Sequence, residues 1–285
     1  MNRGDLSLHY NKLRIVKKGF LLASILFCTT FLFAQRGWEA GVGLGVAHYF
    51  GDLNTDNEIN SIGAAGTAFA RYNFNNRLCW RMGLSFGQIS GSDANSENNF
   101  ENLRNLSFKS DIGEAAASLE FNFLPYNHGS RDKFYTPYLL AGFNVYLYDP
   151  EAELDGNVYK LRQLGTEGQF IGEEYNTIDM GLIYGGGIKL SLSFEWAIQV
   201  ELTSRVLFTD YLDDVSTTYP DYDDLEGLRG DIAVALADRS VDLSSTPIGE
   251  TGRQRGNSTN NDFYAFLTVS AVYYFGGIMC PSVTY

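Results

Sequence analysis

The chain is poor in the residues that build several common kinds of site and fold. Its 285 residues include only three Cys, three His and six Pro. It has no CxxC pair and no His-rich spacing, so the usual zinc sites are not predicted. The longest apolar run, residues 20–33, is shorter than the ~18–20 residues that a membrane-spanning helix needs. The sequence therefore predicts neither a bundle of membrane-spanning helices nor a metal-binding domain of these types.

The N-terminus has the form of a secretory signal peptide over residues 1–34. Four basic residues between positions 12 and 18 precede the apolar run, and Ala34 is the predicted last residue before cleavage. An uncleaved anchor is the alternative, and the shortness of the run favours cleavage. Cleavage leaves a domain over 35–285 with 16 basic and 33 acidic residues, a net charge of −17. So acidic a chain does not predict nucleic-acid binding.

Aromatic residues and glycine are plentiful, with 18 Tyr, 20 Phe and 30 Gly, which favours β structure. In 178–190 (IDMGLIYGGGIKL), one parity carries large apolar residues and the other carries glycines and charges. A half-buried strand has this period of two. The alternation recurs in seven further segments, namely 38–47, 64–74, 78–87, 114–123, 135–147, 195–206 and 263–275.

These eight strands are long, and the connections between them alternate in length. At ~10–14 residues the strands exceed the ~5–6 usual in soluble sheets. Short connections alternate with long loops at about 51–62, 90–110, 149–177 and 209–262. This layout predicts an all-β fold, an eight-stranded antiparallel transmembrane outer-membrane β-barrel with a side-chain-filled interior. A soluble β-sandwich, the alternative, would not explain the strand lengths or the alternation.

The second parity then faces a narrow lumen, where charges of both signs should pair. The residues expected there are Glu39, Arg71, Arg81, Glu114, Glu120, Asp179, Lys189, Glu195, Glu201 and Arg205. Gly185–Gly187 is expected to provide interior clearance, because it lacks the Lys-Ser/Thr ending of a phosphate loop. Aromatic residues at strand ends are expected in interfacial girdles, with ordinary packing as the alternative; these are Trp38, Trp80, Tyr135, Trp196 and Tyr273.

The most acidic segment is 211–227 (YLDDVSTTYPDYDDLEG). It lacks the glycine and terminal glutamate of a calcium-binding EF-hand loop, so a solvated acidic loop is predicted over a calcium site. Arg253 and Arg255 are expected on a solvated face. No nucleophile with a partner base stands out, so neither an enzyme nor a cofactor is predicted. Whether Cys79 and Cys280 pair is left open.

Several stretches carry a resemblance to a known family. They are YFGDLN (49–54), RYNFNNR (71–77), RNLSFKS (104–110), LEFNFLPY (119–126), TPYL (136–139), LGTEGQ (164–169) and FTDYLDDV (208–215). Together they resemble the PorG-like outer-membrane barrels of Bacteroidetes. The resemblance implies a part in the type IX secretion system, where the barrel contacts a periplasmic ring built from a lipoprotein and its partner subunit. The segment 227–261 looks expanded relative to that family, and the tail 282–285 is additional.

The short turns face the ring side in this topology. Candidate partner contacts are therefore Asn75, Asn76, Arg77, His128, Arg131 and Lys133. We expect a structural outer-membrane component of the secretion system, with outer-membrane lipids and the ring proteins as partners. A small surface-exposed barrel that binds a ligand or host surface through its long loops is the alternative. A barrel enzyme or transporter is a third class, which the expected packed interior disfavours.

Overall fold

The computed structural model describes residues 37–55, 61–244 and 247–276. The predicted signal peptide over 1–34 and Cys280 lie outside the described residues. Among the described residues, no helix is long and apolar enough to cross a membrane.

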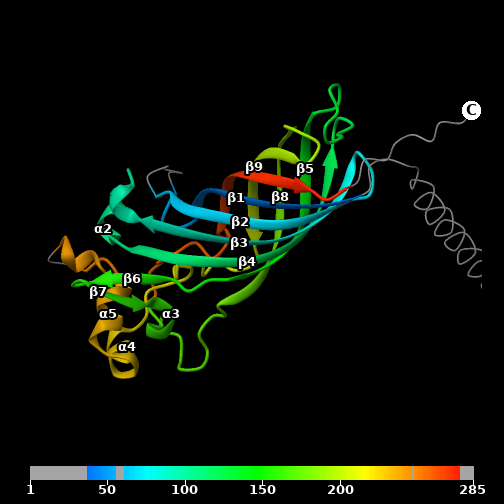
Figure 1. Ribbon diagram of the computed structural model, residues 1–285. Coiled ribbons are helices and arrows are strands. Elements are labelled where there is room, and N and C mark those ends of the chain that lie inside the picture. Colours follow the sequence, from blue (N-terminus) through cyan, green and yellow to red (C-terminus); the bar gives the residue numbers. More distant parts are fainter. Residues whose placement is uncertain (1–36, 56–60, 245–246, 277–285) are drawn as a thin grey trace, which may run out of the picture.

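Eight antiparallel strands close into a barrel (Figure 1). Their order around the barrel is β3-β2-β1-β10-β9-β8-β5-β4, and the pairing of β3 with β4 closes the ring. The predicted eight-stranded antiparallel barrel is therefore confirmed. The strands are β1 (Gly37–Phe50), β2 (Gly63–Asn73), β3 (Leu78–Ser92), β4 (Ser107–Asn122), β5 (Tyr135–Leu147), β8 (Ile178–Ser191), β9 (Trp196–Leu207) and β10 (Phe263–Tyr274).

The strands differ in how far they extend beyond the closed ring. The β3–β4 pairing runs from Leu78↔Phe121 to Ser92↔Ser107, whereas β4 pairs with β5 only as far as Gly113↔Leu147. The β3–β4 hairpin therefore projects past its neighbour. For the same reason, both strands extend into the range 90–110 that was expected to be loop.

Side chains alternate along each strand between the outer wall and the inside of the barrel, as the sequence predicted. Outward residues such as Leu44 and Phe143 are 77% and 71% exposed, while their sequence neighbours face inward. Glycines make room for large inward side chains, because a Cβ on Gly41 would lie 2.3 Å from the ring of Phe69. At Gly187 an added Cβ would lie 2.2 Å from the carbonyl oxygen of Val200. The glycines thus let neighbouring strands and rings approach closely, as predicted.

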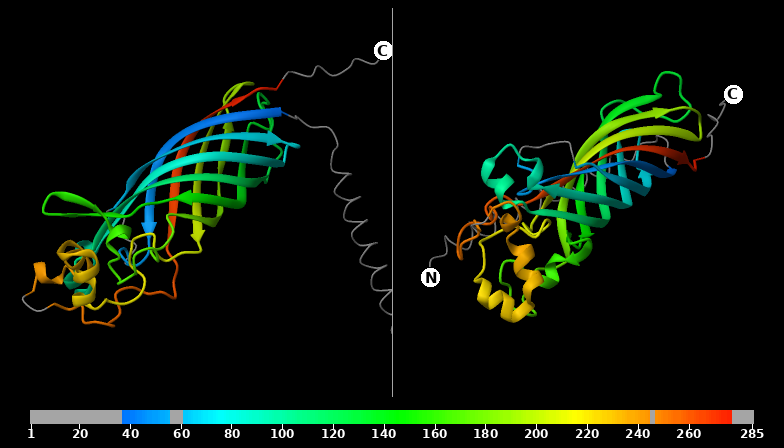
Figure 2. Two further views of the ribbon diagram at one scale, coloured as in Figure 1. Left: turned by 90° about the horizontal axis from the view of Figure 1, so that it is seen from below. Right: turned by 90° about the vertical axis from the view of Figure 1, so that its left-hand side faces the viewer.

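The four long connections fold together into one cap at a single end of the barrel (Figure 2). Both ends of the described chain lie at the opposite end, beside the short turns (Figures 1 and 2). The cap elements are η1 (Asp93–Asn95), α2 (Asn99–Arg104), β6 (Glu151–Leu154), β7 (Asn157–Lys160), α3 (Leu161–Leu164), α4 (Tyr222–Arg229), α5 (Asp231–Ala237) and η2 (Ser240–Asp242).

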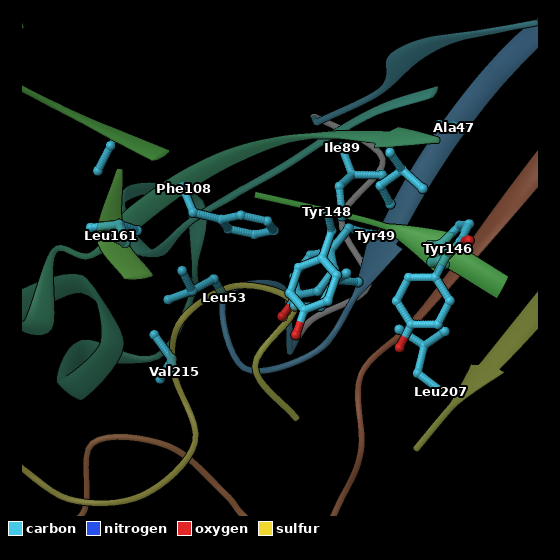
Figure 3. Packing of buried hydrophobic residues seen from close by; sticks show 14 of the residues in the cluster. Ala47, Tyr49, Leu53, Ile89, Phe108, Tyr146, Tyr148, Leu161, Leu207 and Val215 are labelled. Atoms are coloured by element: carbon cyan, nitrogen blue, oxygen red, sulfur yellow. The ribbon is translucent and has the colours of Figure 1, made fainter. Parts of the chain in front are cut away.

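The cap has a hydrophobic core that is continuous with the cap end of the barrel (Figure 3). Tyr49 and Phe108 come from strand ends and meet with ring centroids 4.8 Å apart. Leu53, Leu161 and Val215 come from three different loops, and all are buried in the same cluster. The long loops therefore form a folded layer over the barrel.

Candidate functional site

The lumen at the turn end of the barrel holds a buried network of charges centred on Arg71. Its Nη1 donates to Glu39 Oε2 at 2.6 Å, and its Nε lies 2.8 Å from Glu120 Oε2. Arg71 also donates to the side-chain oxygen of Gln199. These side chains come from strands β1, β2, β4 and β9, so one guanidinium links distant parts of the wall.

Two further cations complete this layer. Lys189 Nζ donates to Glu120 Oε2 at 2.5 Å, and Arg81 Nη1 donates to Glu201 Oε2 at the same distance. The hydroxyl of Tyr138 donates to Glu201 Oε2, also at 2.5 Å. Every charge in the layer therefore has a partner of opposite sign, as buried ions require.

A second layer lies nearer the cap. Arg205 and Glu114 form a two-point ion pair, with Nη2–Oε1 at 2.5 Å and Nε–Oε2 at 3.0 Å. The Tyr264 hydroxyl and the Asn144 amide donate to Glu114 Oε2 at 2.9 and 3.1 Å. Planar, two-point pairing fixes both the geometry and the charge of this layer.

The two layers leave a cavity of about 20 Å³ between them. That is space for about one water molecule, far below what a continuous channel needs. The buried lumen side chains include four carboxylates (Glu39, Glu114, Glu120 and Glu201) and four cations (Arg71, Arg81, Lys189 and Arg205). The lumen is thus filled, as predicted, and these eight charges cancel.

Of the residues that were expected in the lumen, Glu195 lies elsewhere and Asp179 lies at the rim, opposite Tyr146. Glu195 is exposed in the turn between β8 and β9, where its carbonyl accepts a hydrogen bond from Tyr274 N–H at 2.8 Å. That prediction was wrong, because the strand alternation was continued into the turn. Asp179 is half-buried at the cap end of β8, and its carboxylate accepts from the Met180 N–H at 2.7 Å.

His128 closes the turn end of the lumen. Its Nε2 lies 3.1 Å from Glu39 Oε1, and its ring stacks on Tyr274 with centroids 4.7 Å apart. Only 4% of the residue is exposed. The sequence placed His128 among the candidate partner contacts, but its imidazole is buried and does not reach the turn surface.

The structure places the other candidate contacts on two adjacent turns. Arg77 is exposed, and its Nη1 donates to the carbonyl oxygen of Phe123 at 2.7 Å, which links the two turns. Asn75 and Asn76 shape the first turn, since Asn75 Oδ1 accepts from the Arg77 N–H and the Asn76 carbonyl accepts from the Tyr126 N–H. Arg131 and Lys133 are both exposed on the second turn. Three cations therefore share one face.

The cap corrects the prediction of a solvated acidic loop. Asp213 and Asp214 are essentially buried, and Asp262 is 1% exposed. The hydroxyl of Tyr49 lies 2.5 Å from Asp213 Oδ2 and 3.0 Å from Asp262 Oδ1. Burial, with nearby carboxylates, raises the pKa of both Asp213 and Asp262. These carboxyls support the cap core and do not face solvent.

Arg255 also proves to be buried, against expectation. Its Nη1 lies 3.1 Å from Glu167 Oε1, and its Nη2 lies 3.7 Å from Asp214 Oδ2. Asp214 in turn accepts hydrogen bonds from the hydroxyls of Thr166 and Tyr175. The partners of Arg255 are 40 or more residues away in sequence. The local sequence pattern therefore could not predict that this side chain is buried and paired.

The remaining acidic residues of 211–227 do face solvent: Asp221, Asp223, Asp224 and Glu226. Asp221 caps α4, because its Oδ1 accepts from the N–H groups of Asp223 and Asp224 at 3.1 and 3.3 Å. Within the described ranges, no group of three or more His, Cys, Asp or Glu side chains is arranged to hold a metal ion.

Cys79 lies in the lumen at the turn end. Its thiol donates to Asn73 Oδ1 at 2.9 Å and accepts from Asn122 Nδ2 at 3.7 Å.

The strand order, the closed ring and the filled lumen define a small eight-stranded antiparallel β-barrel. A family model described as "Domain of unknown function (DUF6089)" matches residues 17–234, and the chain belongs to that family. No curated protein matches the sequence.

Solved structures with a similar fold are small outer-membrane barrels. Ail of Yersinia pestis is 11% identical, with 85% of this chain and 100% of that chain covered and a TM-score of 0.39. Neisserial surface protein A is 10% identical, with 84% of this chain and 97% of that chain covered and a TM-score of 0.40. OprG of Pseudomonas aeruginosa is 9% identical, with 86% of this chain and 99% of that chain covered and a TM-score of 0.41. Because these TM-scores are low, the assignment of the fold as a barrel rests on the strand pairing within this chain and not on the similarity.

Proposed function

We propose that the chain is an outer-membrane anchor. Its barrel holds the protein in lipid and forms no channel for ions or solutes. The main observation behind this proposal is the contrast between the outer wall of the barrel and its lumen. Large apolar side chains are exposed on seven of the eight strands, all but β2, whose exposed residues are alanines. The inward face is filled, and its eight buried charges cancel. Water disfavours a continuous exposed apolar surface of this kind, whereas lipid accepts it.

The dimensions and the aromatic residues support the same proposal. Outward residues of β1 from Trp38 to Phe50 extend about 40 Å along the strand, which at a tilt of ~40° spans about 30 Å. Trp38 and Trp196 meet Tyr72 and Tyr273 with ring centroids 5.2 and 5.1 Å apart, in a band at the turn end. Such a band suits a membrane–water boundary.

The orientation follows from the short turns. Small outer-membrane barrels keep their short turns in the periplasm and their long loops outside. The proposed barrel therefore presents the folded cap outward and the turn face, with Arg77, Arg131 and Lys133, to the periplasm. In a Cys280→Ser background, Asp223→Cys should react with a membrane-impermeant maleimide on whole cells, whereas Asp132→Cys should react only after the cells are broken.

The resemblance to the PorG-like barrels makes this anchor part of the type IX secretion system in our proposal. The turn face would contact the periplasmic ring lipoprotein and its partner subunit. The two turns carry three exposed cations and one exposed carboxylate, Asp132. This excess of positive charge supports a contact of electrostatic character with an acidic partner. The role is structural, and it uses the barrel as a fixed point in the membrane.

Affinity purification of a tagged copy from its own cells, in mild detergent, tests this role by mass spectrometry. Recovery of the ring subunits with the wild type, and their loss with Arg131→Glu plus Lys133→Glu, is the expected result. Neither side chain belongs to the buried network, so the barrel should stay folded. Arg253→Glu on the cap is the control. Ring recovery unchanged by the double reversal would refute the turn contact.

The folded cap supports a second candidate, a barrel that binds a surface partner. Phe170 and Ile171 are 63% and 69% exposed at the tip of the third long loop. A purification that yields no ring subunits, together with loss of surface adhesion in Phe170→Ser plus Ile171→Ser, would favour this function over the secretion role.

A further inference from the structure

The outer wall of the barrel has a break where β5 leaves β4. The β4–β5 ladder ends at Gly113↔Leu147, and β4 is paired again only at Lys109↔Glu151, by β6. A groove of about 510 Å³ opens at this break, between the wall and α3, whose place beside β6 is seen in Figure 1. This volume falls in the range of sites for small molecules.

The barrel side of the groove is apolar. Phe86, Gly113 and Leu147 stand side by side in one row across β3, β4 and β5. Phe86 and Leu147 are 69% and 53% exposed. A Cβ on Gly113 would lie 3.4 Å from the Phe86 ring and 3.8 Å from Leu147 Cδ1, so the glycine leaves a trough between them. This trough is continuous with the apolar outer surface of the barrel.

The cap side of the groove carries two opposite charges. Arg162 is held by a hydrogen bond from its Nε to the Tyr175 carbonyl at 2.5 Å, and within the described chain its terminal nitrogens form no ion pair. Asp111 accepts from Gln88 Nε2 at 2.7 Å and has no cationic partner among the described residues. Asp149, which also lines the groove, is paired with Lys160 at 3.0 Å, a lysine that it shares with Glu151 at 3.2 Å.

We propose that this groove holds one zwitterionic phospholipid. An acyl chain lies in the Gly113 trough, the phosphate binds Arg162, and the ammonium of the head group binds Asp111. An anionic phospholipid would leave Asp111 without a partner, and an uncharged diacylglycerol would leave both groups unpaired. The inference rests on the proposed membrane embedding, and it adds a defined lipid site to it.

Native mass spectrometry of the full mature chain tests the site. The protein is purified into micelles that contain phosphatidylethanolamine, phosphatidylglycerol or diacylglycerol, and retained lipid is counted. The wild type should retain one phosphatidylethanolamine. Arg162→Gln should weaken its retention about tenfold or more, the loss expected for one charge-assisted contact. Asp111→Asn should weaken phosphatidylethanolamine but not phosphatidylglycerol, and Gly113→Leu should weaken both by filling the trough.

Matched controls come from the cap surface. Arg253 also donates one hydrogen bond to a backbone carbonyl, at 2.9 Å to Ile248, but it lies away from the groove. Arg253→Gln and Asp223→Asn should therefore retain lipid like the wild type. Equal retention by the wild type and Arg162→Gln would overturn the site, as would an equal loss in Arg253→Gln.

Co-flotation with phospholipid vesicles separates the two proposals. A folded chain that floats with vesicles but retains no lipid through Arg162 refutes the groove alone. A folded chain that stays out of the vesicles refutes the membrane anchor, and the groove with it. Each variant is first checked for β-structure by circular dichroism, so that a misfolded variant is not counted as a loss of binding.

Discussion

Neutralising Glu120 is the sharpest test of the lumen as a closed, charge-balanced layer. Its carboxylate lies 2.8 Å from Arg71 Nε, 2.5 Å from Lys189 Nζ and 3.4 Å from Arg81 Nη1, and it is fully buried. Glu120→Gln keeps the shape but leaves four cations facing three carboxylates. Removing one member of a buried ion pair typically costs about 3–5 kcal/mol, and we expect a loss of unfolding free energy of that order.

The assay is urea unfolding of the barrel in lipid vesicles, followed by tryptophan fluorescence. All three tryptophans, Trp38, Trp80 and Trp196, lie on barrel strands, so the signal reports the unfolding of the barrel. The control is Glu151→Gln on the cap, where the partly exposed pair with Lys160 at 3.2 Å should contribute about 0–1 kcal/mol.

A charge-restoring variant tests whether the balance of charges in the lumen causes the loss. Combining Glu120→Gln with Lys189→Gln returns the lumen to three charges of each sign. The double variant should therefore lose less than the sum of the two single losses, by about 1–3 kcal/mol. If Glu120→Gln costs no more than Glu151→Gln, the lumen is hydrated and the argument from buried charge fails.

Three further predictions concern the cap, the packing of the lumen and its closure. Burial raises the pKa of Asp210 to about 7, so the folded cap holds a proton that an unfolded loop releases near pH ~4. Cap stability should therefore fall as the pH rises from about 4 to about 7, and hydrogen exchange in the cap should show a weaker pH dependence in Asp210→Asn. Gly41→Val should lower the unfolding free energy by about 1–3 kcal/mol or prevent folding, because its Cβ would lie 2.3 Å from the Phe69 ring. Gly66→Val, whose nearest contact is 3.8 Å away, should be far milder. In planar bilayers the wild type should show no steady ion conductance, and a stable open channel would contradict the filled lumen.

The barrel could be predicted from sequence because two environments impose one simple rule. An apolar outer wall and a narrow lumen each select every second residue, so Leu44 and Glu39 identify their faces without any knowledge of their neighbours. The same rule misplaced Glu195, because nothing in the alternation marks where a strand becomes a turn. Which lumen charges pair was also hidden, since Arg81 and Glu201 are 120 residues apart.

The cap could not be predicted, because its order comes from contacts between loops. A run of aspartates is usually solvated, and Asp221 and Asp223 follow that rule. Asp213 departs from it because Tyr49, 164 residues away, supplies a hydrogen bond inside the cap core. His128 is similar, since only the closed barrel brings Glu39 and Tyr274 to its ring. The sequence carries no local signal for either arrangement.

The shared core of the four loops has a consequence for the order of assembly. Leu53, Leu106, Leu161 and Val215 belong to four different loops, yet they are buried in one cluster. Those loops meet only when β1, β3, β5 and β9 already stand in their places around the ring. The cap should therefore be the last part of the molecule to become protected, because its contacts form only after the strands are in place. Resistance of the 208–262 segment to protease is then a direct readout of barrel closure, and it can be followed in time without any probe on the barrel itself.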